Sequence, residues 1–188
     1  MIVSEKMTTL KPITQKRLNN IALYYLSRYE SSSENLRRLL QRRVARAEMK
    51  GSVVPPEVPE WIDSIVSEMR RLGYIDDRRF ASSVAEKYRK SGKSRAYICQ
   101  KLTMAGIPAD MQADILAEAD NYSTEETELE AARLLVKKRR LGTYRPEQDQ
   151  LLFRKKDLAV LARAGFSYQT AVKALGTAER NEDENDWD

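Results

Sequence analysis

The sequence contains no histidine, so it lacks the commonest general base and the commonest metal ligand of proteins. Its single cysteine, Cys99, excludes a disulfide within the chain and is typical of a reducing compartment. The longest apolar run, Ile21 to Leu26, falls far short of the roughly 18 residues that span a bilayer. Residues 1–10 lack the apolar core of a signal peptide. We therefore expect a cytoplasmic protein that does not enter a membrane.

Three short patterns that could carry chemistry have simpler explanations. Asp76 and Asp77 resemble a catalytic carboxylate pair, but adjacent helical residues do not face each other, and helix capping explains both. The run 92–94 (GKS) ends like a phosphate-binding loop, but Lys87 stands where that loop needs its first glycine. Cys99 has no histidine partner. We expect no enzyme activity, no catalytic residue, no metal and no cofactor.

Apolar residues recur at helical spacing along most of the chain, and no stretch alternates as a half-buried strand does, so we predict an all-α fold. Serine and threonine precede several of these stretches at positions typical of helix N-caps. The expected N-caps are Thr14, Ser94 and Ser167, and the expected capping boxes are Ser31 with Glu34 and Ser123 with Glu126. The expected helix ends include Gly51, Gly92 and Gly142, and the expected anchors of a helix at 147–164 are Leu151, Leu158 and Leu161. Residues 51–60 contain three prolines and are predicted to form a semi-rigid linker.

The stretch 72–80 predicts a tight corner between two helices. Gly73 is expected to end the first helix in the left-handed conformation, with Tyr74 folding back onto Met69 as in a Schellman motif. Asp76 is the expected N-cap of the second helix, and Asp77 places a second carboxylate at its positive end. Phe80 begins the apolar face of that helix. A β-branched residue in place of the corner glycine should therefore break the fold.

The same stop, in which glycine lies between apolar residues, recurs at Gly73, Gly106 and Gly165. If the second helix of each unit ends at Gly51, Gly106 and Gly165, the chain contains three units, and we predict an elongated array of three tandem three-helix repeats. The expected segments are a flexible N-terminus at 1–12, repeats at 13–75, 76–121 and 124–177, and an acidic disordered tail at 178–188. The alternative is coincidence, because many helices end in glycine.

The net charge of +5 hides an uneven distribution of charge along the chain. Residues 179–188 contain six acidic residues and one basic residue, and the rest of the chain has 32 basic and 22 acidic residues, a net charge of +10. A basic body with an acidic tail favours a polyanion or an acidic protein surface as partner. The simpler alternative is that these lysines and arginines only solvate the helices.

The corner and the segment after it resemble the signature of the RecX family, the regulators of bacterial RecA recombinase. The match includes every position of the run 72–81 (LGYIDDRRFA) except Arg78, and it continues at Gly92, Ile98, Leu102, Gly106 and Ile107. Upstream, Ser32, Leu36 and Leu40 resemble the family's first repeat, and downstream 161–175 resembles its C-terminal repeat, so that the resemblance covers 20–176. Asn35 stands where the family often has an acidic residue, the linker lengthens the first unit, and the acidic tail lies outside the shared pattern.

The resemblance implies three tandem three-helix repeats and a non-enzymatic regulator that binds the groove or the end of the RecA–DNA filament. Such a protein inhibits filament extension, ATP hydrolysis, strand exchange and SOS co-protease activity. We expect a monomer, and the basic residues expected to contact the filament are Arg37, Arg38, Arg42, Arg79, Lys87, Lys90, Lys93, Arg95, Lys137, Lys138, Arg139 and Arg140.

Two other functions fit a basic helical protein. A DNA-binding helix–turn–helix protein would concentrate base-reading arginine, asparagine or glutamine on one recognition helix. A helical scaffold for another partner would not depend on RecA. Because the basic residues are spread over many helices, we favour filament binding, with which weak direct contact to single- or double-stranded DNA is compatible.

Overall fold

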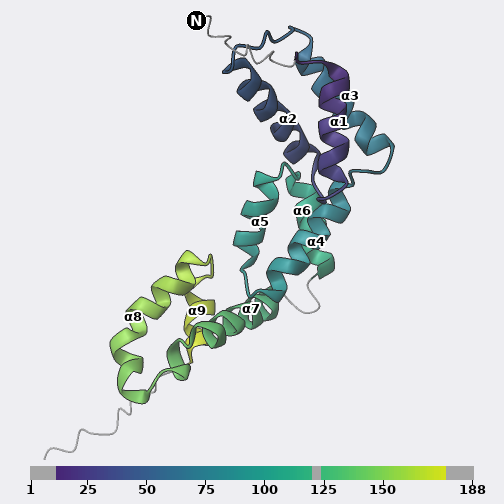
Figure 1. The fold of residues 1–188 in the computed structure, drawn as a ribbon. Coiled ribbons are helices and arrows are strands. Elements are labelled where there is room, and N and C mark those ends of the chain that lie inside the picture. Colours follow the sequence, from purple (N-terminus) through teal and green to yellow (C-terminus); the bar gives the residue numbers. More distant parts are fainter. Residues whose placement is uncertain (1–11, 120–123, 177–188) are drawn as a thin grey trace, which may run out of the picture. The chain divides into compact units, whose positions relative to one another are not determined.

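The computed structural model describes residues 12–119 and 124–176, and every regular element within these ranges is a helix (Figure 1). The helices are α1 (Gln15–Leu26), α2 (Ser33–Glu48), α3 (Val58–Arg71), α4 (Asp77–Lys90), α5 (Arg95–Met104), α6 (Ala109–Ala119), α7 (Thr124–Arg139), the 3-10 turn η1 (Gly142–Tyr144), α8 (Glu147–Arg163) and α9 (Tyr168–Leu175). The all-α prediction is confirmed for the described residues. The predicted N-terminal segment up to residue 11, the acidic tail and the cap at Ser123 lie outside them.

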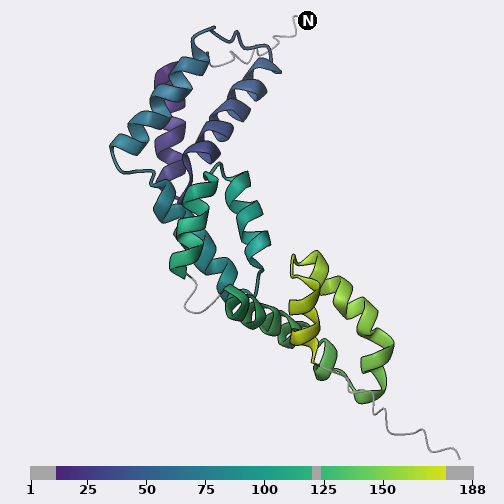
Figure 2. The same ribbon diagram turned by 180° about the vertical axis from the view of Figure 1, so that it is seen from behind.

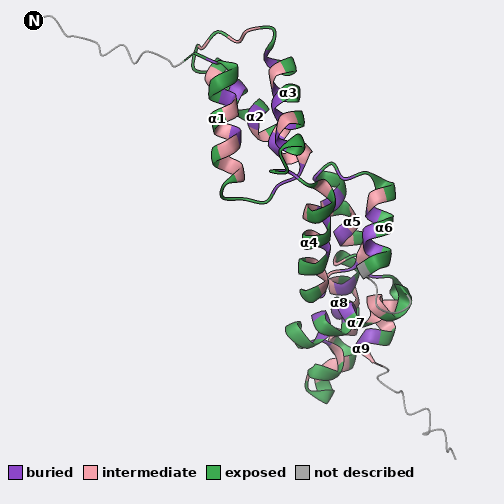
Figure 3. Cartoon of the chain, turned by 90° about the vertical axis from the view of Figure 1, so that its right-hand side faces the viewer, coloured by how far each residue is buried: buried purple, intermediate pink, exposed green. Residues whose placement is uncertain are grey.

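The chain divides into two compact units. The first contains Met1–Phe80 with Ala105–Ile107, and the second contains Ala81–Met104 with Pro108–Asp188. Each unit has its own cluster of buried apolar residues. Figure 3 colours the buried positions of the cartoon purple. The boundaries of the three expected repeats stay a prediction.

In the first unit, α1, α2 and α3 lie side by side, as Figures 1 and 2 both show. Leu18, Leu36, Leu40, Ile65 and Met69 face one another and are between 0% and 3% exposed. They recur every three or four residues along their helices, which places them on one face of each. Because full burial of such a side chain stabilises the fold by about 1.5–3 kcal/mol, these three apolar stripes hold the helices together.

In the second unit, α7 packs against α9, and α8 packs against α9 as well. Ala132, Val136 and Leu161 are completely buried, and Phe166 and Leu175 are at most 5% exposed. Alanines also occupy the buried faces of α7 and α9, so the two helices can approach closely without leaving voids.

A buried carboxylate fixes the connection between α7 and α8. Asp157, only 1% exposed, accepts two hydrogen bonds of 2.8 Å from the Arg145 guanidinium and one of 2.9 Å from the Gly142 N–H. Burial opposes the ionisation of Asp157, but these hydrogen bonds and the charge of Arg145 outweigh it and hold the pKa of the carboxyl below its usual range. The ion pair is therefore part of the fold.

Four of the predicted N-caps are present in the structure. Each capping side chain accepts a hydrogen bond of 2.9–3.3 Å from the backbone N–H three residues later. These residues are Thr14, Asp76, Ser94 and Ser167. Gly73 has φ of 75°, and its N–H and that of Tyr74 donate to the carbonyls of Arg70 and Met69. This pattern confirms the backbone of the predicted Schellman stop.

Two predictions are wrong, one at the start of α2 and one just after the end of α3. The N-cap of α2 is Ser32, which accepts from the Asn35 N–H at 3.2 Å, and not Ser31. After Gly73, the buried apolar residue is Ile75, whereas Tyr74 is 53% exposed. A cap or an apolar contact can move by one residue because several neighbouring side chains satisfy the same local rule.

Three further boundaries and anchors differ from prediction. Residues 58–60 belong to α3 and not to the linker, because Pro59 in the first turn need not donate an intrahelical hydrogen bond. The end of α7 is formed by Arg140 in the left-handed conformation, with φ of 52°, and not by Gly142. In α8, Leu151 is 65% exposed, while Asp157 occupies a buried position one turn before Leu161.

Candidate functional site

Three segments of the first unit meet at the N-terminus of α2. The Ser32 hydroxyl donates a 2.6 Å hydrogen bond to the Ala105 carbonyl, just before the glycine that follows α5. The Asp77 carboxylate accepts from both the N–H and the hydroxyl of Ser33, at 2.7 Å each. A Cβ on Gly106 would lie only 2.3 Å from the Cβ of Glu34. We call the group Ser32, Ser33, Asp77, Ala105 and Gly106 the first junction.

The second unit contains the same arrangement at the N-terminus of α5. The Ser94 hydroxyl donates a 2.6 Å hydrogen bond to the Ala164 carbonyl, just before the glycine that follows α8. The Glu128 carboxylate accepts from the Arg95 N–H at 2.6 Å. A Cβ on Gly165 would lie 2.5 Å from the Ser94 hydroxyl oxygen. We call the group Ser94, Arg95, Glu128, Ala164 and Gly165 the second junction.

The junctions explain much of the sequence signature at 72–81 and 92–107. Asp76 caps α4, whereas Asp77 binds the first N–H of α2, where a carboxylate also meets the positive end of the helix. Gly106 needs both a positive φ of 76° and the space of a missing side chain. Phe80, half-buried, lies in the first turn of α4. These signature residues therefore build the fold.

In the first unit, several of the predicted binding cations already have carboxylate partners. Arg37 forms salt bridges to Glu34 at 3.2 Å and to Asp63 at 3.0 Å. Partial burial works against the charge of Arg37, but these hydrogen bonds outweigh it and raise its pKa. Arg38 also binds Glu34, at 2.7 Å, and Arg79 binds Glu30 at 3.3 Å. These three cations are partly neutralised locally, whereas Arg42 is exposed and forms no salt bridge within the described chain.

In the second unit, the predicted cations fall into two groups. Three of them have partners or are partly covered. Lys90 binds Glu86 on the preceding turn, Arg95 is half-buried at the second junction, and Lys93 lies 4.8 Å from the centre of the Tyr97 ring. The other predicted cations of this unit are exposed and form no salt bridge among the described residues: Lys87, Lys137, Lys138, Arg139 and Arg140. Four of these five cluster at the C-terminal end of α7, so the structure concentrates unpaired positive charge there.

A pocket of about 150 Å³ lies between α5, α7 and α8 in the second unit. It is lined by Lys93, Tyr97, Leu135, Arg139, Val160, Arg163 and Ala164, and we call it the basic pocket. Sequence reasoning missed Tyr97 and Arg163. The spacing of Lys93, Tyr97 and Lys101 at i, i+4 and i+8 could have indicated the first, because both lysines lie over the Tyr97 ring.

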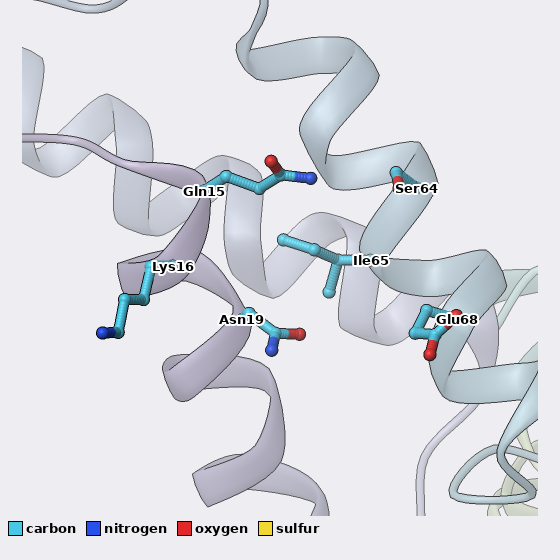
Figure 4. Close-up of a pocket in the computed structure, with 6 residues that line it drawn as sticks. All are labelled: Gln15, Lys16, Asn19, Ser64, Ile65 and Glu68. Carbon is cyan, nitrogen blue, oxygen red and sulfur yellow. The ribbon is translucent and has the colours of Figure 1, made fainter.

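A larger hollow of about 420 Å³ lies between α1 and α3 in the first unit (Figure 4). Ile65 points between the two helices in this view, and Gln15, Asn19 and Ser64 surround it with uncharged polar groups. The two charges, on Lys16 and Glu68, have opposite signs. The hollow therefore has no excess charge that would select a ligand.

The described residues thus form an all-helical protein with an exposed basic surface, and none of their helices is long and apolar enough to cross a membrane. The regulatory protein RecX of Myxococcus xanthus is 37% identical to this chain over 166 residues, which cover 88% of this chain and 87% of the relative. The regulatory protein RecX of Agrobacterium fabrum is 27% identical over 165 residues, 87% of this chain and 85% of the relative. The chain belongs to the RecX family of regulatory proteins.

Solved structures agree on the fold. The crystal structure of RecX from Lactobacillus salivarius has a TM-score of 0.60 at 19% identity, covering 86% of this chain and 94% of that one. A second crystal structure of a regulatory protein RecX has a TM-score of 0.59 at 24% identity, covering 83% and 68%. No protein-family model matches the chain.

Proposed function

We propose that this protein regulates RecA by binding the groove or the end of the RecA–DNA filament, and that it thereby inhibits filament extension, ATP hydrolysis, strand exchange and SOS co-protease activity. The observation that carries the proposal is the 37% identity to a regulatory protein RecX over most of both chains. The protein acts as a cytoplasmic monomer without a cofactor and catalyses no reaction.

The unpaired cations supply a physical basis for this binding. Arg42, Lys87, Lys137 and Lys138 are exposed, belong to three different helices, and form no salt bridge among the described residues. An acidic surface or a phosphate can therefore approach them without first displacing a carboxylate of the protein. Contacts that are spread over several helices suit an extended partner. A protein that reads DNA bases would instead concentrate its contacts on a single recognition helix.

We also propose that the two junctions are one structural element repeated along the chain. Ser32 caps α2, the second helix of the first expected repeat, and binds the Ala105 carbonyl after α5, the second helix of the next repeat. In the same way, Ser94 caps α5 and binds the Ala164 carbonyl at the end of α8. The third such helix, α8, has Pro146 at its N-cap position, where no side chain forms a capping hydrogen bond, so it has no serine that could bind a further repeat. A terminal repeat that lacks the docking group supports the division at 13–75, 76–121 and 124–177.

The test is inhibition of RecA ATP hydrolysis on single-stranded DNA by a variant in which Arg42, Lys87, Lys137 and Lys138 are all alanine. Each exposed contact contributes about 0.2–1 kcal/mol, so Arg42→Ala alone should weaken inhibition only slightly. The four changes together should raise the inhibitory concentration by about one to two orders of magnitude, because tenfold corresponds to about 1.4 kcal/mol.

The matched control replaces four other exposed cations, Lys16, Lys50, Lys155 and Lys173, and so removes the same net charge. It should inhibit nearly as well as the parent. Equal inhibition by the parent and the folded four-site variant would contradict the proposed surface. If inhibition instead followed the affinity of each variant for bare DNA, the alternative of a direct DNA-binding protein would replace the proposal.

A further inference from the structure

The basic pocket combines an apolar floor with a cationic rim. Leu135, only 5% exposed, and the half-buried Val160 form part of the floor. Lys93, Arg139 and Arg163 contribute three positive charges, and none of them forms a salt bridge within the described chain. The pocket therefore favours a ligand that carries both an apolar group and several negative charges.

The size of the pocket fits an aromatic ring. An engineered apolar cavity of about 150 Å³ binds benzene, and the basic pocket has a volume of about 150 Å³. One wall is the Tyr97 ring, which already meets Tyr88 edge to face at 5.2 Å between ring centres. A further aromatic side chain in the pocket can also contact the Lys93 ammonium, which lies over this ring.

The chain itself contains a segment with these properties. Residues 179–188 include six carboxylates, and Trp187 stands between Asp186 and Asp188. The segment follows α9, which ends at Leu175. Leu175 packs closely on Gly142, because a Cβ added to Gly142 would lie 2.6 Å from the Leu175 carbonyl oxygen. Gly142 comes three residues after the pocket residue Arg139.

The tether is long enough to reach. Trp187 comes eleven positions after Gly176, and an extended chain spans up to about 3.3–3.6 Å per residue. Because the segment belongs to the same chain and its tether is short, its effective concentration at the pocket is about millimolar. Weak contacts are therefore sufficient to keep the site occupied.

We propose that the acidic segment 179–188 binds the basic pocket of its own chain, with Trp187 against the apolar floor and its neighbouring carboxylates on Lys93, Arg139 and Arg163. The bound segment blocks acidic partners from this part of the surface. Because exposed charges are screened over about 10 Å at 0.1 M salt, the segment is released as ionic strength rises.

The test is acrylamide quenching of Trp187 fluorescence in the full chain, with Trp61→Phe so that Trp187 is the single reporter. Each exposed contact removed should shift the ratio of open to bound segment about 1.5- to 5-fold. Replacing Lys93, Arg139 and Arg163 by alanine should therefore increase quenching at low salt to the level that the parent reaches at high salt. The assay contains no RecA, so its result is independent of the proposed function.

The matched control replaces Lys16, Lys50 and Lys155, which removes the same charge away from the pocket. It should be quenched like the parent, and circular dichroism should show that both variants are folded. If Trp187 is quenched equally in the parent and the pocket variant at low salt, the proposal is wrong. Equal increases in the pocket variant and the control would also overturn it, because they would show attraction by net charge rather than by this pocket.

Discussion

The two junctions use the same hydrogen bonds but different charges. In both, a serine hydroxyl binds a carbonyl at 2.6 Å, and a carboxylate binds the first N–H of the capped helix. Asp77 takes its second hydrogen bond from the neutral Ser33 hydroxyl. Glu128 takes its second from Arg89, at 2.7 Å, and these two side chains are only 16% and 11% exposed. The second junction therefore contains a charge pair with little access to water.

This difference shows that one backbone scheme can be completed by different side chains. Asp77 is the first residue of α4, whereas Glu128 is the fifth residue of α7 and has the longer side chain. The carboxylates differ in both position and length, yet each reaches the first N–H of a helix. The two junctions should respond differently when their carboxylate is removed, because a charge facing little water depends more on its partner.

The largest expected effect follows from removing Glu128. Glu128→Ala takes away the carboxylate that Arg89 faces and should lower the free energy of unfolding by about 3–5 kcal/mol, the usual cost of breaking a buried charge pair. Asp77→Ala should cost about 1–3 kcal/mol, because its partners are uncharged groups. Urea denaturation measures both. Glu130→Ala, at an exposed position of the same helix, is the control. Equal losses at Asp77 and Glu128 would contradict the distinction between the junctions.

The next effect compares the glycine of the first junction with the glycine of the corner. Gly106→Ala adds a Cβ that would lie 2.3 Å from Glu34, at φ of 76°, and should cost about 2–5 kcal/mol through overpacking and backbone strain together. Gly73→Ala meets no atom within 4 Å and should cost about 1–2 kcal/mol from its φ alone. The same denaturation assay applies. A larger loss at Gly73 would show that the close approach at Gly106 relaxes without cost.

A smaller effect, with a distinct pH dependence, is expected at Asp157. Asp157→Asn loses the charge that Arg145 and the Gly142 N–H bind, and should lower stability at pH 7 by about 1–3 kcal/mol. Because the folded-state pKa of this carboxyl is lowered, its contribution is complete above the unfolded value of about 3.9 and is lost as pH falls through the folded value. The difference from the parent should therefore shrink only at acid pH, as measured by thermal unfolding from pH 7 to pH 2. A difference that is constant over this range would contradict the ionised form.

The elements that the sequence predicted well are those fixed by neighbours in the chain. An N-cap such as Thr14 acts three residues away, and the stop at Gly73 involves only the preceding turn. The pairing of Asp77 with Ser33 spans 44 residues, and that of Glu128 with Arg95 spans 33. No local pattern distinguishes such a carboxylate from the exposed ones.

The same limit applies to the candidate site. The sequence identified Lys137, Lys138 and Arg139 because they are consecutive, and the structure places them in an exposed cluster. It could not show that Arg37 is held by Asp63, from another helix, or that Arg163 lines a pocket with Lys93. Both facts depend on how helices pack, which charge patterns along one helix do not specify.

In the proposed function, different residues hold the fold and contact the filament, and one assay tests that separation directly. RecA ATP hydrolysis on single-stranded DNA is measured with increasing amounts of Asp77→Ala and of the four-site variant at Arg42, Lys87, Lys137 and Lys138. Both are assayed at a temperature where circular dichroism shows them folded. We predict that Asp77→Ala inhibits RecA like the parent, although it unfolds at lower urea, and that the stable four-site variant inhibits poorly. Loss of inhibition in folded Asp77→Ala, with full inhibition by the four-site variant, would show that the signature contacts RecA and would contradict the account.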